Sequence, residues 1–282
     1  MRNQFYERRR KAPKVPAPAW GNSHAAGWSV RMNARLKVVL MHAAFITAFL
    51  LLWEYAMRRE WLQATFFGQP SGIAMYLWDG FVVDRKLWRE LGYTIAGTLV
   101  SFCLGSVSAL TLGLLFVMFP RLERALDPYL MVLNAMPRFA LAPLFLLWFG
   151  LGIGSKIAVG TSLSFFIVLA NTVAGIRGVS PDLVTLSRSL GATPRQIFFK
   201  VTMPGAVPVI FSGLRLALVF SMLGVVGAEI IAAEHGLGQT LSYLQSTFNM
   251  NGVMGLLVLL ATLGMLVTRG MTRLEKALLK WQ

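Results

Sequence analysis

Residues 178–204, GVSPDLVTLSRSLGATPRQIFFKVTMP, form a polar interruption between two long apolar runs near 156–176 and 207–232. Each run has the roughly 20 mostly apolar residues that a helix needs to cross a bilayer. A few residues suffice to join two such helices, so an ordered connection of about 30 residues indicates a further role. The sequence therefore predicts a structured element between two membrane helices.

The first half of this connection has the signals of a short helix. Ser180 is suited to cap its start, and Pro181 is suited to its first position. Asp182 complements the positive helix end, and Gly191 can end the helix in a left-handed conformation. We expect a helix between Ser180 and Gly191.

The second half predicts another helix. Thr193 and Gln196 have the spacing of a capping box, and we expect this helix to end by Pro204. The pair of helices would present basic and apolar side chains together: Arg188, Arg195, Lys200, Leu190, Ile197 and Phe198. Such a mixed surface is typical of docking into a groove of a partner protein, or of an amphipathic helix on anionic lipid.

Apolar runs of similar length recur on both sides of this connection. Of the 282 residues, 56% are hydrophobic and 14% are charged, which leaves too little polar surface for a water-soluble protein of this size. The fold class is therefore all-α, a polytopic membrane protein with six transmembrane helices. The predicted spans are Val38–Met57, Leu91–Met118, Tyr129–Phe149, Lys156–Ile176, Val207–Ala232 and Gly252–Arg269.

The rest of the chain divides around these spans. We expect a basic cytoplasmic tail at 1–36, and a first span followed by an interfacial segment at 37–90. A core with the other five spans would occupy 91–282, with the connecting loop at 178–205. If the tail lies inside, about 19 Lys and Arg residues face the cytoplasm and about 6 face outward. Both termini and the loop are then cytoplasmic.

The formal net charge of +15 does not predict a nucleic-acid partner. The basic residues crowd the tail and alternate loops, where they orient a multi-span protein, rather than one soluble face. A phosphate-binding Gly-x-x-x-x-Gly-Lys-Ser/Thr loop is missing from the sequence, and the three histidines are scattered. We expect no cofactor or metal in this chain.

Small residues recur at every fourth position of the second span: Gly97, Ser101, Gly105, Ala109 and Gly113. The fifth span has a shorter series, Gly213, Ala217 and Ser221. Each series forms a smooth stripe against which another helix can pack closely. The partner helix belongs either to the same subunit or to a neighbouring one.

The spacing from Gly191 to Pro204, with Val201 and Met203 before the proline, resembles the signature loop of binding-protein-dependent ABC importer permeases. That signature reads Glu-Ala-Ala, three residues, Gly, nine residues, Ile-x-Leu-Pro. Here Thr185, Leu186 and Ser187 stand at the Glu-Ala-Ala positions. Further motifs resemble the nitrate, sulfonate and taurine branch over about 69–282. They lie at 122–128, 134–143, 147–150, 212–218, 227–229 and 236–238.

The resemblance implies a permease subunit of an ABC importer in the bacterial inner membrane, and not an enzyme. Two permease copies would form the pore, a separate ATPase with ATP and Mg²⁺ would drive it, and a periplasmic binding protein would deliver substrate. It implies ATPase-coupling residues in the loop. These are Thr185, Leu186, Ser187, Arg188, Leu190, Gly191, Ala192, Arg195, Val201, Met203 and Pro204.

Polar residues inside the apolar runs are candidates for the translocation pathway, because charges there are costly without a role. They are Asn134, Arg138, Asn171, Arg215 and Glu229. Arg138 follows Pro137 midway through the third span, where a loosened helix can expose an anion-attracting charge, or can let Arg138 pair with a carbonyl or carboxylate. Arg215 and Glu229 also suit snorkelling or pairing between subunits. An anionic small solute is favoured.

Two other classes of function remain open from the residues alone. A self-sufficient secondary carrier or channel would transport without an ATPase, although six spans are few for two inverted repeats. A membrane-embedded enzyme or scaffold would need catalytic clusters that the sequence does not show.

Overall fold

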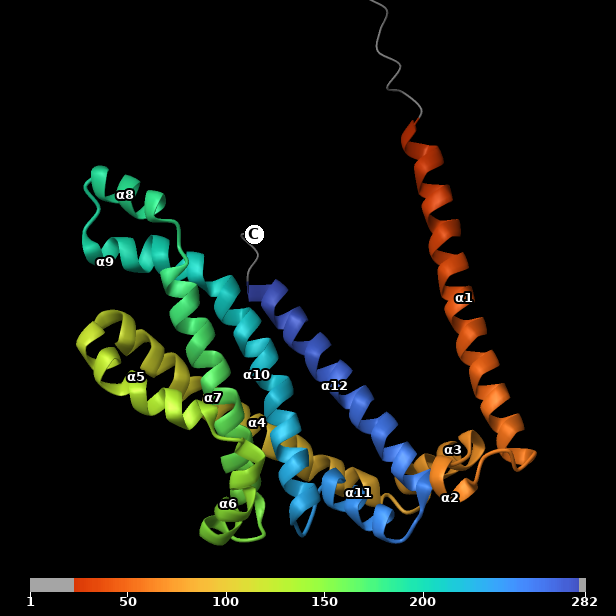
Figure 1. The fold of residues 1–282 in the computed structure, drawn as a ribbon. Helices are drawn as coiled ribbons and strands as arrows, with labels where there is room; N and C mark the ends of the chain where they lie inside the picture. Colours follow the sequence, from red (N-terminus) through yellow and green to blue (C-terminus); the bar gives the residue numbers. More distant parts are fainter. Residues whose placement is uncertain (1–22, 279–282) are drawn as a thin grey trace, which may run out of the picture. The chain divides into compact units, whose positions relative to one another are not determined.

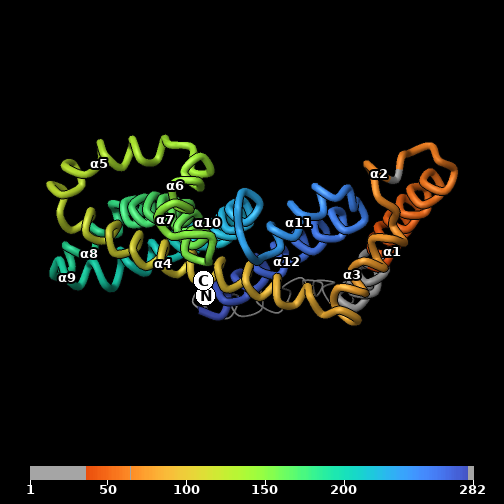
Figure 2. Tube along the Cα trace, turned by 90° about the horizontal axis from the view of Figure 1, so that it is seen from below, coloured from red at the N-terminus to blue at the C-terminus, as the bar shows by residue number. Residues whose placement is uncertain are grey.

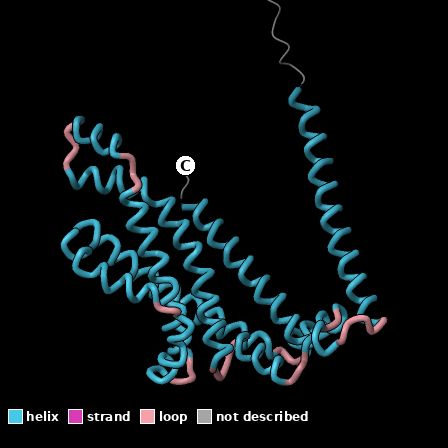
Figure 3. The backbone as a smooth tube through the Cα atoms, in the orientation of Figure 1, coloured by secondary structure: helices cyan, strands magenta, loops and turns pink. Residues whose placement is uncertain are grey.

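The computed structural model describes residues 23–278, which fall into two units, one ending at Tyr55 and the other beginning at Ala56. Within 23–278 the regular elements are all helical, as predicted, and short loops join them (Figure 3). Helix α1 (Ser23–Arg58) contains the predicted first span. Residues 1–22 of the predicted tail lie outside the described residues.

Within the described residues, five helices are long and apolar enough to cross a membrane. They comprise Leu36–Arg58 of α1, α4 (Lys86–Met118), α7 (Ile153–Arg177), the continuous stretch Pro194–Ile231, and α12 (Met250–Leu278). A sixth crossing exists if a sharply bent pair of helices counts as one span. These segments agree with the predicted spans except at Tyr129–Phe149.

The predicted span Tyr129–Phe149 is not one straight helix. It is divided between α5 (Pro120–Ala135) and a 3₁₀ turn, η3 (Arg138–Leu141), that leads into α6 (Ala142–Phe149), and the two parts are bent by 87°. Pro137 between them cannot donate a backbone hydrogen bond, and it holds Met136 in an extended conformation. The bend turns α6 back against α7 (Figure 2).

Helices α4, α7 and α10 (Met203–Ile231) form the centre of the second unit, with α7 packed against both of the others (Figure 1). The small-residue stripe of α4 lies in this contact and is buried. A Cβ on Gly105 would lie 2.1 Å from Ser164 Oγ of α7. On the α10 stripe, a Cβ on Gly213 would lie 2.4 Å from the Cβ of Asn171 of α7. Both stripes are therefore used within the subunit.

Short helices occupy the predicted interfacial segment: α2 (Ala64–Phe67), α3 (Pro70–Trp78) and a π turn, η2 (Asp79–Val83). Helix α3 packs against α12, where a Cβ on Gly252 or Gly255 would meet the ring of Tyr76. Helix α11 (Leu237–Ser246) joins the same apolar cluster through Leu237, Leu241 and Leu244. α11 lies at the end of α10 opposite α8 and α9 (Figure 1).

The close approach of α4 and α7 predicts the effect of adding one methyl group. Gly105→Ala should destabilise the fold by about 1–3 kcal/mol, because the new Cβ would overlap Ser164 and press on the Thr161 carbonyl. Thermal unfolding of the detergent-purified protein measures this. Gly92→Ala is the matched control on the same helix, since nothing lies within 4 Å of its Cβ position. A midpoint for Gly105→Ala equal to that of Gly92→Ala would contradict the packing.

Candidate functional site

The loop between α7 and α10 folds into two short helices, α8 (Pro181–Ser189) and α9 (Pro194–Ile197), which project from the end of the helical core (Figure 1). Pro181 occupies the first turn of α8, as predicted. The predicted side-chain cap at Ser180 is wrong, because its hydroxyl makes no hydrogen bond to that turn. The proline itself removes one N–H that would otherwise need a partner.

The turn between these helices follows the sequence prediction. Gly191 has φ +81°, and the N–H groups of Gly191 and Ala192 donate to the carbonyls of Arg188 and Ser187 at 3.0 and 3.1 Å. The capping box is complete: Gln196 N donates to Thr193 Oγ1 at 3.3 Å, and Thr193 N donates to Gln196 Oε1 at 2.8 Å. Both helix ends at the turn are thus satisfied by local hydrogen bonds.

The second helix does not end by Pro204, which corrects the sequence prediction. α9 runs through a π turn, η4 (Phe198–Thr202), directly into α10, where Pro204 sits in the first turn. A π turn is wider than an α turn, and it accommodates the pyrrolidine ring and the missing donor of Pro204 without breaking the helix. The loop is therefore continuous with a membrane helix from Pro194 to Ile231.

Large apolar side chains are exposed on this loop, notably Leu183, Leu186, Leu190 and Phe199. Ile197, predicted on the surface, is buried instead. The predicted coupling residues that are exposed are Thr185, Leu186, Arg188, Leu190, Gly191 and Arg195. The partly buried ones are Ser187, Ala192, Val201, Met203 and Pro204. An apolar surface edged with arginine therefore projects from the core.

A second candidate site lies at the break between α5 and η3. The Arg138 guanidinium donates to both the carbonyl and the side-chain oxygen of Asn134, and it lies 4.6 Å from the centre of the Phe166 ring. Its buried Nε has no hydrogen-bond partner. Across residues 23–278, no carboxylate lies within salt-bridge distance of Arg138. The break thus brings together Asn134 and Arg138 and leaves the cation without a counter-charge.

Residues 101–280 match the family model described as "Binding-protein-dependent transport system inner membrane component". The chain belongs to this family. It is 32% identical to the putative aliphatic sulfonates transport permease SsuC of Bacillus subtilis, over 88% of both chains. It is 31% identical to the formylaminopyrimidine transport permease ThiX of Halalkalibacterium halodurans, over 84% of this chain and 94% of that one.

A solved structure of the MetNI methionine ABC transporter, in an inward-facing conformation, has a similar fold. The TM-score is 0.58 with 26% identity, over 68% of this chain and 95% of that chain. The protein is thus a multi-pass permease subunit of an ABC importer and not an enzyme, because ATP hydrolysis in such transporters occurs in separate ATPase partners. The resemblance to the sulfonate and taurine branch is confirmed.

The other predicted pathway residues of the permease make contacts inside the subunit. Arg215 of α10 pairs with Glu275 of α12. Asn171 donates to the Ile167 carbonyl at 2.8 Å and packs against Gly213. Glu229 is buried at the far end of α10 from the loop that holds α8 and α9, the predicted coupling loop. The structure does not bring these three together with Arg138 and Asn134, and their place in the pathway stays a prediction.

Sequence reasoning missed the partners of Glu229. Lys156 and Thr94 both contact its carboxylate, and neither was a candidate. One signal was present in the sequence: Lys156 begins one apolar run and Glu229 lies near the end of another, so both lie at the same membrane level in the predicted topology. Opposite charges at the same depth in a helical bundle favour an ion pair.

The turn at Gly191 generates a prediction about the rigidity of the coupling loop. Gly191→Val should loosen the loop by about 1–2 kcal/mol, because a side chain in the left-handed region is strained while nothing within 4 Å could clash with it. Faster trypsin cleavage after Arg188 and Arg195 in the purified protein measures this. Gly191→Asn, which tolerates the conformation, is the control and should be cleaved at nearly the native rate. Equal cleavage of the Val and Asn variants would contradict the assignment.

Proposed function

We propose that this permease imports a small anionic solute of the nitrate, sulfonate or taurine kind. Two copies of the chain form the pathway, a separate ATPase that binds ATP and Mg²⁺ docks on α8 and α9, and a periplasmic binding protein delivers the solute. The observation that carries the proposal is the exposed, ordered helix pair continuous with α10. A displacement of this pair would be transmitted into a membrane helix without an intervening loop.

The coupling loop has the surface that protein docking requires. Leu186 and Leu190 are 58% and 80% exposed, and Arg188 and Arg195 are exposed on the same loop. Apolar anchors edged by arginine are typical of protein interfaces. An ordered turn, closed by its own hydrogen bonds, would let the loop move as a rigid body when the ATPase changes conformation.

The charge distribution supports an orientation with both termini and the coupling loop in the cytoplasm. The description of the family as an inner membrane component supports a location in the inner membrane. The end of α10 near α11 then lies on the periplasmic side, where a binding protein would deliver substrate. The connection between α10 and α12, residues 232–249, has no Lys or Arg, in agreement with an outer location.

Arg138 supports an anionic solute. Its charge sits at a helix break, with an unused Nε donor and no carboxylate within reach in the described part of the chain. Guanidinium groups bind carboxylate, sulfonate and phosphate oxygens through charge-assisted hydrogen bonds. The aliphatic sulfonates named for the Bacillus relative are anions, whereas ThiX is named for a pyrimidine. Arg138 therefore favours an anionic solute over a pyrimidine.

Charge reversal on the loop tests the docking surface. Arg188→Glu with Arg195→Glu should reduce co-purification with the cognate ATPase by about tenfold or more, because two carboxylates would replace the two guanidinium groups that edge the docking surface. The matched control is Arg121→Glu with Arg124→Glu, which reverses two charges on α5. Unchanged ATPase binding by the loop variant would argue against this surface. Solute uptake into vesicles without ATPase or nucleotide would overturn ATP-driven import.

Replacement of Arg138 tests the anion. Arg138→Leu should lower ATP-driven uptake of the anionic solute by about tenfold, since a charge-assisted contact contributes about 1.5–3 kcal/mol. Arg138→Lys keeps the charge and should retain most of the uptake. Co-purification of the ATPase, measured in parallel, shows that the complex still assembles. Full uptake by an assembled Arg138→Leu complex would refute the role of this residue.

A further inference from the structure

A buried ion pair joins α7 to α10. Lys156 Nζ lies 3.5 Å from Glu229 Oε1, and their side chains are 2% and 0% exposed. Lys156 also donates to the backbone carbonyl of His235. Removing a charge from water costs several kcal/mol, so each of these groups depends on the other and on its hydrogen bonds. The ion pair therefore holds two membrane helices, α7 and α10, and the connection that follows α10 together.

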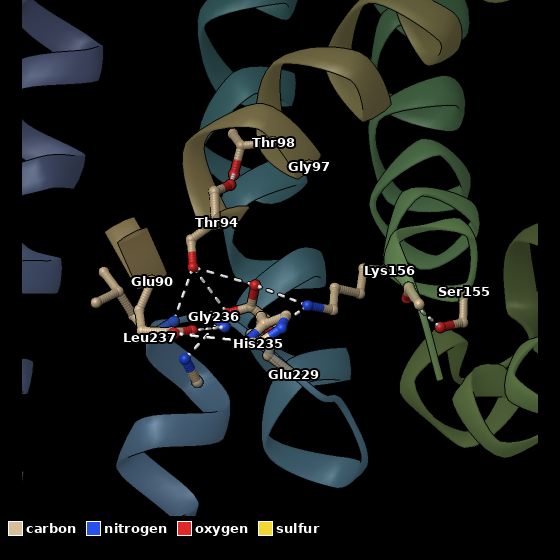
Figure 4. Close-up of polar contacts among 12 residues, drawn as sticks. Glu90, Thr94, Gly97, Thr98, Ser155, Lys156, Glu229, His235, Gly236 and Leu237 are labelled. Carbon is tan, nitrogen blue, oxygen red and sulfur yellow. Dashed lines mark hydrogen bonds and ion pairs between the residues drawn. The ribbon is translucent and has the colours of Figure 1, made fainter. Parts of the chain in front are cut away.

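The Glu229 carboxylate also binds α4 and α11 (Figure 4). Thr94 Oγ1 donates to it at 2.9 Å, and the N–H of Gly238 donates at 3.0 Å. Thr94 Oγ1 in turn accepts from the N–H of Leu237 at 2.9 Å. One carboxylate thus links four elements, α4, α7, α10 and α11, through a single buried network.

Three consecutive N–H groups at the start of α11 are held in this way. Besides those of Leu237 and Gly238, the N–H of Gly236 donates to Glu90 of α4 at 2.6 Å. The start of a helix has unpaired N–H groups and a partial positive charge, which carboxylates satisfy. The side chains of α4 and α10 therefore fix where α11 begins.

Two glycines allow the backbone to close over Glu229. Gly236 has φ +121°, and a Cβ there would lie 2.0 Å from Glu229 Oε1. A Cβ on Gly238 would lie 2.5 Å from the Val226 carbonyl and 2.6 Å from the Cβ of Glu229. A side chain at either position would force α11 away from α10. The Gly-Leu-Gly sequence is thus required by the contact.

The position of α11 determines the shape of a cavity. One face of α11 packs with α12 through Leu241 and Leu244, while its polar face turns toward the end of α10. Between them is a cavity of about 250 Å³, lined by Glu229 and Ile231 of α10 and by α11. The α11 lining consists of Gln239, Ser242, Tyr243 and Ser246. Any shift of α11 relative to α10 changes the width of this cavity.

The 29 residues of α10 separate this cavity from the coupling loop by about 43 Å at 1.5 Å per residue. We propose that Glu229 and Lys156 are positioning residues for transport: they lock α11 to α4, α7 and α10, so that the cavity at this end changes only when the core helices move. The proposal rests on ATP-driven import as proposed above. Because the buried pair ties α11 to the core helices, movement of the coupling loop and movement at the far end of the pathway occur together.

A set of variants in the assembled transporter tests the lock. Glu229→Gln and Lys156→Met each leave one buried charge unpaired. The double variant removes both charges, and the new amide oxygen at position 229 can still accept from the N–H of Gly238. Gly238→Ala displaces α11 and leaves both charges intact. Two quantities are measured in liposomes: solute imported per ATP hydrolysed, and the alkylation rate of a reporter cysteine.

The reporter is Ser242→Cys, which lines the cavity, in a Cys103→Ser background; Gln245→Cys on the exposed side of α11 is its control. We expect Glu229→Gln and Gly238→Ala to raise alkylation at position 242 by about fivefold and to lower solute per ATP by about tenfold. Alkylation at position 245 should not change. The double variant Lys156→Met with Glu229→Gln should return both quantities to within about threefold of the native values.

Each outcome bears on the lock. Native alkylation and native solute per ATP in Gly238→Ala, or in an assembled Glu229→Gln complex, would overturn it. So would a double variant that restores assembly but not the two measured quantities. If Glu229→Gln fails to insert into the membrane, the alkylation rate and the solute per ATP of Gly238→Ala and of the double variant test the lock instead. A native complex that imports without ATP would refute the proposed function, while the alkylation rates would still report on the lock.

Discussion

The second unit is organised around the close contact of α7 with α4 and α10. In a bilayer, apolar side chains gain little by leaving lipid, so helices associate through tight packing and interhelical hydrogen bonds. Here glycine and serine supply both. Ser101 of α4 donates to the Ile157 carbonyl of α7 at 3.2 Å, and Gly160 of α7 touches Gly224 of α10.

This three-helix centre fixes what lies at its two ends. At one end, α10 continues through η4 into α9, so the coupling loop is an extension of a core helix. At the other end, α7 and α10 contribute Lys156 and Glu229, which hold the start of α11. Between the ends, η3 and α6 pack on the core: a Cβ on Gly227 of α10 would meet the Phe139 ring, and Ala142 packs with Ala228. The helix break that contains Arg138 is thereby packed against the same helices.

A charged side chain within an apolar segment is energetically costly, and the structure stabilises such side chains in three ways. Glu229 and Lys156 neutralise each other in a fully buried network, and Arg215 pairs with Glu275 at the edge of the bundle. Arg138 is different, because a side-chain amide, a carbonyl and an aromatic ring hold its guanidinium while none of them carries negative charge. A cation kept without a counter-charge in such surroundings is suited to an anionic ligand.

The features that depend on local chemistry could be predicted from the residues alone. Hydropathy located the spans, and the residues of the coupling loop specified the turn at Gly191 and the Thr193–Gln196 capping box, because each involves neighbours within a few residues. Local chemistry also predicted that Pro137 loosens the helix. It did not predict the 87° bend, because the direction of the bend depends on the packing of α6 against α7. Likewise Pro204 predicted a helix end, but η4 accommodates the proline and the helix continues.

The contacts between distant groups follow from the packing of the helices and could not be predicted. Thr94 and Glu229 are 135 residues apart, and Lys156 and the His235 carbonyl are 79 apart. A sequence shows that a buried carboxylate needs partners, but many polar groups could serve, and the choice follows from how the helices cross. The small-residue stripes were ambiguous for the same reason: a smooth helix face fits any helix, and only the packed fold shows that α4 and α10 turn theirs toward α7.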